Sequence, residues 1–228
     1  MNKFALISVA LAALPWENAL GEVSGRITVA SEYIYRGQAQ SNGNPALQAG
    51  IDYAHRSGLF LGAWASTLDL ESPSGRRDAE LTYYLGWHFA GDSRLSGAVS
   101  LTRYTYPGQT TAFSYDYTEA LASATWDGRY SLEVGYASEV YGFPVDARHI
   151  ELRVDWPLRN AWMVSGGLGF NDLEKLGSSR YAYGDIGVSA RYSRFTFDLR
   201  WYNNERPDGF IGQLSAGSQL VGAVSLGF

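Results

Sequence analysis

The 228-residue sequence contains no cysteine, which excludes disulfide bonds, thiolate nucleophiles and Cys-ligated metal sites. Lysine is almost absent too, because Lys3 and Lys175 are the only lysines among 18 basic residues. The net charge of −5 leaves no basic stripe to neutralise phosphates, so nucleic acid is excluded as a partner. Charged residues make up only 18% of the chain, below the roughly 25% of an average soluble domain.

Long apolar runs are also missing beyond the amino terminus. No later run approaches the roughly 18–20 residues of a membrane-spanning helix, so a membrane protein with this sequence has to be a β-barrel. What the chain has in abundance is glycine (26), tyrosine (16) and tryptophan (7). These residues suit a sheet with tight turns and aromatic side chains at a membrane interface.

The amino terminus has the features of an export signal. Lys3 gives a positive start, and residues 4–14 form an apolar run of signal-peptide length. Ala19 and Gly21 place small residues at positions −3 and −1 before Glu22. The sequence therefore predicts a cleaved signal peptide over residues 1–21 and a mature domain over residues 22–228.

From residue 22 onward, apolar and polar residues alternate with the period of two that is typical of β-strands. The clearest example spans residues 150–156, where Ile, Leu, Val and Trp alternate with Glu, Arg and Asp. The first strand is predicted over residues 23–36, with Tyr33 and Tyr35 on its apolar face, followed by a polar loop over 37–44. The third strand, residues 59–70, is apolar on both faces and cannot be oriented.

The pattern predicts about twelve strands of roughly 10–14 residues, long enough for a tilted membrane strand. A soluble β-sandwich is the alternative, but its strands usually have only about 5–6 residues. The connections alternate between two to four residues and about five to fourteen, with aromatic residues near the strand ends, as in outer-membrane barrels. We therefore predict an all-β fold: a closed antiparallel up-and-down transmembrane β-barrel in the bacterial outer membrane, in contact with its lipid.

The last stretch, residues 218–228, alternates a bulky apolar face with a small one and ends at Phe228. It resembles the closing strand of a bacterial outer-membrane barrel. We expect it to pair with the first strand, which removes both sheet edges. The resemblance implies that the barrel-assembly machinery recognises this strand and that Phe228 takes part in membrane assembly.

A second resemblance lies near the start of the mature chain. Residues 31–37 read Ser-Glu-Tyr-Ile-Tyr-Arg-Gly, and residues 44–53 read Asn-Pro-Ala-Leu-Gln-Ala-Gly-Ile-Asp-Tyr. This stretch resembles the amino-terminal part of the TorF-family porins, and the close match covers roughly residues 28–68. The resemblance implies a porin that gives passive diffusion of small hydrophilic solutes.

Charged residues occupy the faces opposite the apolar ones and are predicted to line the lumen. The predicted pore-lining residues are Glu32, Arg36, Asp52, Glu80, Glu119, Glu133, Glu151, Arg153, Asp155, Asp185, Arg191, Asp198 and Arg200. With Arg26 added, acids outnumber arginines, so we expect a weak preference for cations unless the charges only brace the wall in pairs.

One register can be predicted from the two-residue turn at Ser193 and Arg194. It places Ser189 opposite Asp198 and Gly187 opposite Arg200. Arg191–Asp198 and Asp185–Arg200 then become diagonal neighbours within reach of each other.

The chain offers little for catalysis or for cofactors. Its histidines are His55, His88 and His149, and none lies in a nucleophile motif. Asp146 and Glu151 near His149 make only a weak metal-site pattern. We expect no enzyme activity, no cofactor and no metal; the alternatives are a non-conducting structural barrel and an outer-membrane hydrolase with a lumen or rim histidine.

Overall fold

The structure is a computed structural model of the chain and describes residues 21–70, 76–90, 94–107, 114–173, 179–205 and 216–228. Its strands are β1 (Glu22–Ala30), β2 (Ile34–Tyr35), β3 (Gln38–Ala39), β4 (Ala46–Ala54), β5 (Leu59–Leu70), β6 (Arg77–Ala90), β7 (Leu95–Thr105), β8 (Tyr117–Trp126), β9 (Tyr130–Ala137), β10 (Ala147–Pro157), β11 (Trp162–Leu173), β12 (Ser179–Tyr192), β13 (Phe195–Asn204) and β14 (Gln219–Gly227). The predicted signal peptide lies outside the described residues, apart from Gly21.

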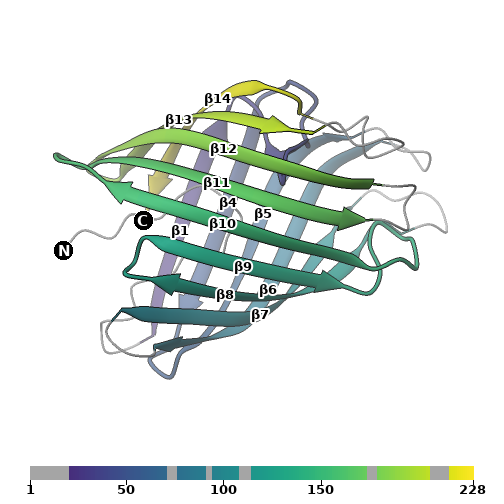
Figure 1. Cartoon of the computed structure of the whole chain (residues 1–228), viewed down its shortest axis with the longest axis horizontal. Coiled ribbons are helices and arrows are strands. Elements are labelled where there is room, and N and C mark those ends of the chain that lie inside the picture. Colours follow the sequence, from purple (N-terminus) through teal and green to yellow (C-terminus); the bar gives the residue numbers. More distant parts are fainter. Residues whose placement is uncertain (1–20, 71–75, 91–93, 108–113, 174–178, 206–215) are drawn as a thin grey trace.

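Twelve strands close into one antiparallel barrel, with β2 and β3 forming a separate two-stranded sheet (Figure 1). Each barrel strand pairs with its neighbours in the chain, and β1 pairs with both β4 and β14. The predicted fold class and strand number are therefore confirmed. In the described residues, no helix is both long and apolar enough to span a membrane.

The seam between β1 and β14 forms as predicted. Arg26 lies opposite Gly227, and Ala30 lies opposite Ala223. The backbone of Phe228 completes the seam through two hydrogen bonds with Gly25, at 2.8 and 3.0 Å. Because every barrel strand has two partners, the barrel sheet has no free edge.

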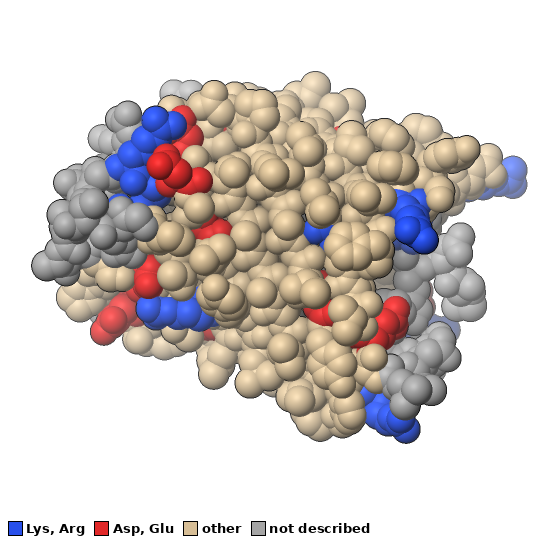
Figure 2. Space-filling view, turned by 180° about the vertical axis from the view of Figure 1, so that it is seen from behind, with Lys and Arg blue, Asp and Glu red and all other residues tan. Residues whose placement is uncertain are grey.

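The outer face of the wall is apolar. Large hydrophobic side chains stay exposed at every second position, for example Leu101, Leu152 and Leu168. Figure 2 shows a broad band without charge across the middle of the wall, with charged side chains gathered toward its two ends. An exposed apolar band between charged ends fits a wall that faces lipid.

Short and long connections occupy opposite ends of the barrel, as predicted. The connections after β4, β6, β8, β10 and β12 have two to four residues. Those after β5, β7, β9, β11 and β13 have five to fourteen, and fifteen residues separate β1 from β4. The fifteen-residue segment between β1 and β4 contains β2 and β3, and it folds into the barrel.

The prediction for the first strand is wrong beyond its first half. The strand was expected to continue to Arg36, but β1 ends at Ala30 and the chain then leaves the wall. Local hydrogen bonds replace the wall pairing, since Tyr33 N donates to Ser41 Oγ at 2.9 Å. Tyr33 is only 4% exposed, so its ring is buried inside the barrel and is not on the lipid face where we predicted it.

The structure also orients the strand that the sequence left undecided. On β5, Phe60, Ser66 and Leu68 are buried, whereas Leu59 and Leu61 are exposed to the outside. Trp64 lies on the inward face as well, where its ring contacts the Tyr33 ring edge-on at 5.4 Å. The inward face of β5 therefore carries two aromatic rings, Phe60 and Trp64, and no charge.

Candidate functional site

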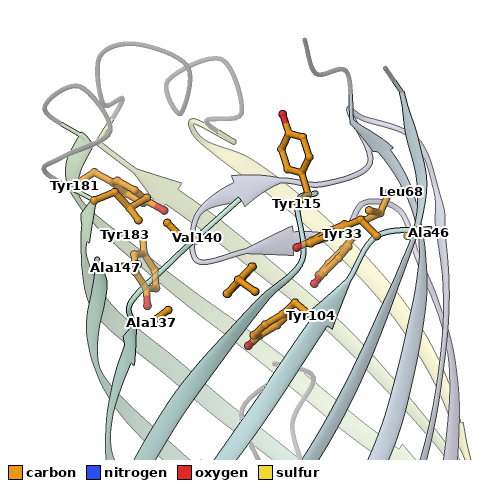
Figure 3. Packing of buried hydrophobic residues seen from close by; sticks show 13 residues of the cluster. Tyr33, Ala46, Leu68, Tyr104, Tyr115, Ala137, Val140, Ala147, Tyr181 and Tyr183 are labelled. Carbon is orange, nitrogen blue, oxygen red and sulfur yellow. The ribbon is translucent and has the colours of Figure 1, made fainter. Parts of the chain in front are cut away.

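The segment between β1 and β4 folds into the barrel and forms a hairpin across the lumen (Figure 3). Tyr35 pairs with Gln38, and the two residues between them, Arg36 and Gly37, have φ angles of 48° and 75°. Two successive positive φ values make a tight turn that favours glycine. We call residues 31–45 the lumen hairpin.

The tip of the lumen hairpin is fixed to the wall at β12 and β13. Gly37 O accepts hydrogen bonds from Asn204 Nδ2 at 2.8 Å and from Ala216 N at 3.0 Å. Gln38 Nε2 donates to the hydroxyl of Tyr181 on β12 at 2.8 Å. The hairpin therefore starts at β1 and reaches β12 and β13, which narrows the lumen.

Aromatic side chains pack around this hairpin and fill the lumen toward the long-loop end. The buried cluster consists of Tyr33, Ala46, Leu68, Tyr104, Tyr106, Tyr115, Tyr117, Ala137, Val140, Ala147, Leu173, Tyr181 and Tyr183. Figure 3 shows these side chains converging from several strands on the interior of the barrel. Close packing of this kind holds the hairpin in one position.

The first of two charged groups lies at the hairpin tip. Arg36 donates from both Nη atoms to the two carboxylate oxygens of Glu119 on β8, at 3.0 Å each. His149 on β10 lies between two carboxylates: Nδ1 is 3.1 Å from Glu119, and Nε2 is 3.1 Å from Glu133 on β9. Nε2 is also 3.2 Å from Arg36 Nη2. We call these four residues the tip cluster.

Electrostatics keep the Arg36 side chain charged. Burial, the largest single effect, would lower the pKa of its guanidinium group, but the Glu119 carboxylate and the tyrosines around it together outweigh burial and hold the pKa well above its ordinary value. Glu119 is surrounded by donors, since the Tyr104 hydroxyl also donates to it at 3.2 Å. The Arg36–Glu119 pair is therefore a permanent, charge-assisted link between the hairpin and the wall.

The second charged group braces the wall between β10 and β13. Arg153 donates to Asp185 at 2.8 Å and to Glu151 at 3.0 Å. Arg200 donates to Asp185 and Asp198 and to the hydroxyl of Ser165. We call Glu151, Arg153, Asp185, Asp198 and Arg200 the wall cluster.

The register predicted for β12 and β13 is confirmed. Ser189 lies opposite Asp198, and Gly187 lies opposite Arg200. The expected Asp185–Arg200 ion pair forms. Asp198 pairs with Arg200 on its own strand at 3.2 Å, a contact that the sequence did not predict.

The remaining predicted lumen residues are distributed outside these two clusters. Glu32 accepts a hydrogen bond from Gly43 N within the hairpin. Glu80 is buried and accepts from Thr82 and from Tyr33, and Asp52 accepts from Tyr84. Asp155 and Arg191 lie on the inward faces of β10 and β12 and are partly exposed.

The exposed fraction of the side chain differs among the charged residues where the lumen hairpin narrows the lumen, which we call the constriction. Glu133 and Glu151 are each 19% exposed, whereas Arg153 is 9% and Arg200 is 1% exposed. Arg36 reaches 12%. Glu133 and Glu151 are thus more accessible than the arginines of the two clusters, whereas Glu119, 2% exposed, is more buried than its partner Arg36.

The contacts described for the three histidines differ from those of a hydrolase site. His149 contacts two carboxylates and a guanidinium group, and not the hydroxyl nucleophile that a Ser–His pair requires. His55 does contact Ser57 Oγ at 2.7 Å, but this exposed pair belongs to a turn in which Ser57 N also donates to His55. The ring of His88 packs on Phe60 at 4.3 Å.

The two acidic residues near His149 in the sequence, Asp146 and Glu151, contact arginines. Asp146 lies 3.5 Å from Arg148, and Glu151 lies in the wall cluster. Across the residues whose placement is described, no group of three or more histidine, aspartate or glutamate side chains is arranged to hold a metal ion.

Solved porin structures share this architecture. The KdgM porin matches with a TM-score of 0.56 and 8% identity, over 92% of this chain and 99% of that one. The NanC porin matches with a TM-score of 0.56 and 7% identity, over 91% and 99%. A KdgM porin in complex with disordered oligogalacturonate gives a TM-score of 0.55 with 9% identity, over 92% and 99%. At this level of identity, the similarity shows a shared fold.

Sequence comparison identifies the family. No curated protein matches the chain at a significant level. Residues 17–216 match the family described as "Bacterial protein of unknown function (Gcw_chp)". The match covers most of the chain, including the lumen hairpin and both charged clusters, and the protein therefore belongs to the Gcw_chp family.

Proposed function

We propose that the protein is a non-enzymatic channel of the bacterial outer membrane, through which small hydrophilic solutes diffuse passively. The closed barrel, its exposed apolar band and its charged interior support this proposal. The similarity to the KdgM and NanC porins and the resemblance of residues 28–68 to TorF-family porins agree with it. In this proposal residues 1–21 are removed on export, and the barrel-assembly machinery inserts the mature chain through β14.

The finer proposal is a weak preference for cations. One observation carries it: Glu133 and Glu151 are the most exposed charged side chains of the two clusters, and the arginines beside them are more buried. A ring of carboxylates favours cations in a pore. Oligogalacturonate, named with one similar porin, is an acid, so we expect this lumen to pass it less readily than a neutral sugar of equal size.

A closed structural barrel is the second candidate, because the lumen hairpin and its aromatic neighbours fill much of the interior. Single-channel recordings of refolded protein and liposome swelling with small neutral sugars separate the two. Conductance with a reversal potential that indicates cation preference supports both the channel function and the proposed selectivity. A clear anion preference refutes the cation preference but leaves the channel function standing. If neither conductance nor swelling is detected, the channel proposal fails and the closed barrel is favoured.

A further inference from the structure

The tip cluster contains one histidine, His149, which lies between two carboxylates and a guanidinium group. His149 is buried, with 1% of its side chain exposed, and both ring nitrogens face charged partners. Histidine is the side chain that changes charge between about pH 5 and pH 8. Whether each contact of the ring is favourable therefore depends on which of its two nitrogens carry a proton.

The contacts around His149 cannot all be favourable in one protonation state. When the ring is neutral and its proton is on Nδ1, it donates to Glu119, and Nε2 accepts from Arg36 Nη2. The Nε2 lone pair then faces the Glu133 oxygen at 3.1 Å, which is an unfavourable contact between two acceptors. When both nitrogens are protonated, Nε2–H donates to Glu133 instead.

Arg36 and Glu119 are held in both states. Arg36 keeps its two bonds to Glu119 whether or not Nε2 accepts from it, and Glu119 keeps the donors Arg36 and Tyr104. Glu133 differs from them, because within the described part of the chain its only side-chain partner is His149 Nε2. A change in the protonation of His149 therefore changes the hydrogen bonding of Glu133.

The backbone lets the ring reach both acids. His149 on β10 lies opposite Gly135 on β9, and a Cβ at Gly135 would collide with the imidazole ring. With no side chain in the way, the ring extends over β9 toward Glu119 on β8. The charged groups that face it are Arg36 from the hairpin, Glu119 from β8 and Glu133 from β9. Glu151 is the next inward residue on its own strand, and on β11 the opposite residue is the neutral Asn171.

We propose that His149 is a protonation switch that sets the charge selectivity of the constriction, an inference that rests on the proposed channel function. With the ring protonated, the two cations and two carboxylates of the tip cluster balance. Loss of the Nε2 proton to water in the lumen leaves the cluster with a net charge of −1 and releases Glu133. Glu133 lies directly opposite Glu151 on the neighbouring strand, so two partly exposed carboxylates then face the solute path together.

The consequence is a preference for cations that rises with pH. One added negative charge a few ångströms from the path should raise the ratio of cation to anion permeability by about threefold between pH 5 and pH 8. The measurement is the reversal potential in planar bilayers under asymmetric KCl, at pH values across this range. His149→Gln should remove the pH step, and Glu133→Gln should lower the ratio and move the remaining step to lower pH.

A matched control is another histidine of the same barrel. His55 is exposed at the β4–β5 turn, so His55→Gln should keep the full pH step. A wild-type channel whose selectivity is flat across this range would overturn the inference while leaving the proposed function standing. So would a pH step that persists in His149→Gln.

A second readout does not depend on conductance. The Cε1–H signal of His149 in an NMR titration of refolded protein, assigned by its loss in His149→Gln, should shift across this pH range. In Glu133→Gln the shift should move to lower pH, because the ring loses a carboxylate that stabilises its cation. A ring that does not titrate refutes the switch, whereas a titrating ring in a barrel without conductance refutes the channel function and with it the selectivity claim.

Discussion

Arg36 and Glu119 are 83 positions apart in the sequence and form a two-pronged ion pair inside the barrel, with both contacts at 3.0 Å. Arg36 sits at the turn of the lumen hairpin, and Glu119 sits on β8 in the wall. The pair therefore connects an element that narrows the lumen to an element that forms it. Its strength determines how firmly the constriction is held.

Breaking this pair should loosen the hairpin. Arg36→Gln leaves the Glu119 carboxylate buried without its main partner, and removing one member of a buried pair costs about 3–5 kcal/mol. We expect faster backbone hydrogen exchange in residues 33–40 and a higher single-channel conductance. Arg103→Gln is the control, because Arg103 belongs to an exposed pair with Asp116 at 3.5 Å. Unchanged exchange and conductance in Arg36→Gln would show that the tyrosine packing alone holds the hairpin.

Two glycines of the hairpin provide a matched pair of substitutions. Gly37 and Gly43 have similar φ angles, 75° and 77°, so alanine brings similar backbone strain at both. A Cβ at Gly37 would lie 2.8 Å from the Cβ atoms of Asn204 and Tyr183, whereas at Gly43 it would meet nothing within 4 Å.

Gly37→Ala should therefore displace the hairpin tip from β12 and β13, and Gly43→Ala should not. Overpacking of this kind costs about 1–3 kcal/mol beyond the shared strain. The expected result is increased conductance and faster exchange of the Gln38 amide in Gly37→Ala only. Equal effects of the two substitutions would contradict the tight seating of the tip.

The wall cluster should contribute to the stability of the barrel. Arg200 is 1% exposed and contacts Asp185, Asp198 and Ser165, so Arg200→Met removes the partner of two buried carboxylates. We expect a loss of about 3–5 kcal/mol in the free energy of unfolding, measured by urea denaturation in lipid vesicles. Arg180→Met at the exposed Arg180–Asp172 pair should cost only about 0–1 kcal/mol. Similar losses in both variants would mean that the buried charges contribute no more than surface ones.

The sequence predicted the barrel wall well because the rule behind it is local. Inward and outward residues alternate, and a two-residue turn allows only one pairing of the strands it joins. For this reason the Ser193–Arg194 turn gave the register of β12 and β13 and the Asp185–Arg200 pair correctly. Arg153 of β10 and Asp185 of β12 both lie opposite Gly167 of β11, and the missing side chain there leaves room for their contact, which alternation alone did not predict.

The lumen hairpin was missed for a related reason. Tyr33 and Tyr35 alternate with Glu32 and Arg36 as they would in a wall strand, and alternation does not distinguish a lipid-facing ring from one buried in the lumen. The useful signal was Gly37, which follows Arg36 and allows the tight turn. The contacts of His149 were also beyond reach, because they depend on where the hairpin tip docks.

Closure of the barrel at the β1–β14 seam gives the last prediction. Deleting residues 226–228 removes the pairing of Leu226 and Gly227 with β1 and both backbone hydrogen bonds between Phe228 and Gly25. A barrel that cannot close exposes unpaired backbone groups to lipid, so the truncation should abolish membrane assembly and not only weaken stability. Protease resistance of membrane fractions and heat-modifiable migration on gels measure assembly. Phe228→Ala keeps the two backbone hydrogen bonds and removes only the ring, so it separates closure of the seam from recognition of Phe228 by the assembly machinery. A truncated chain that still inserts and resists protease would refute the requirement for the seam.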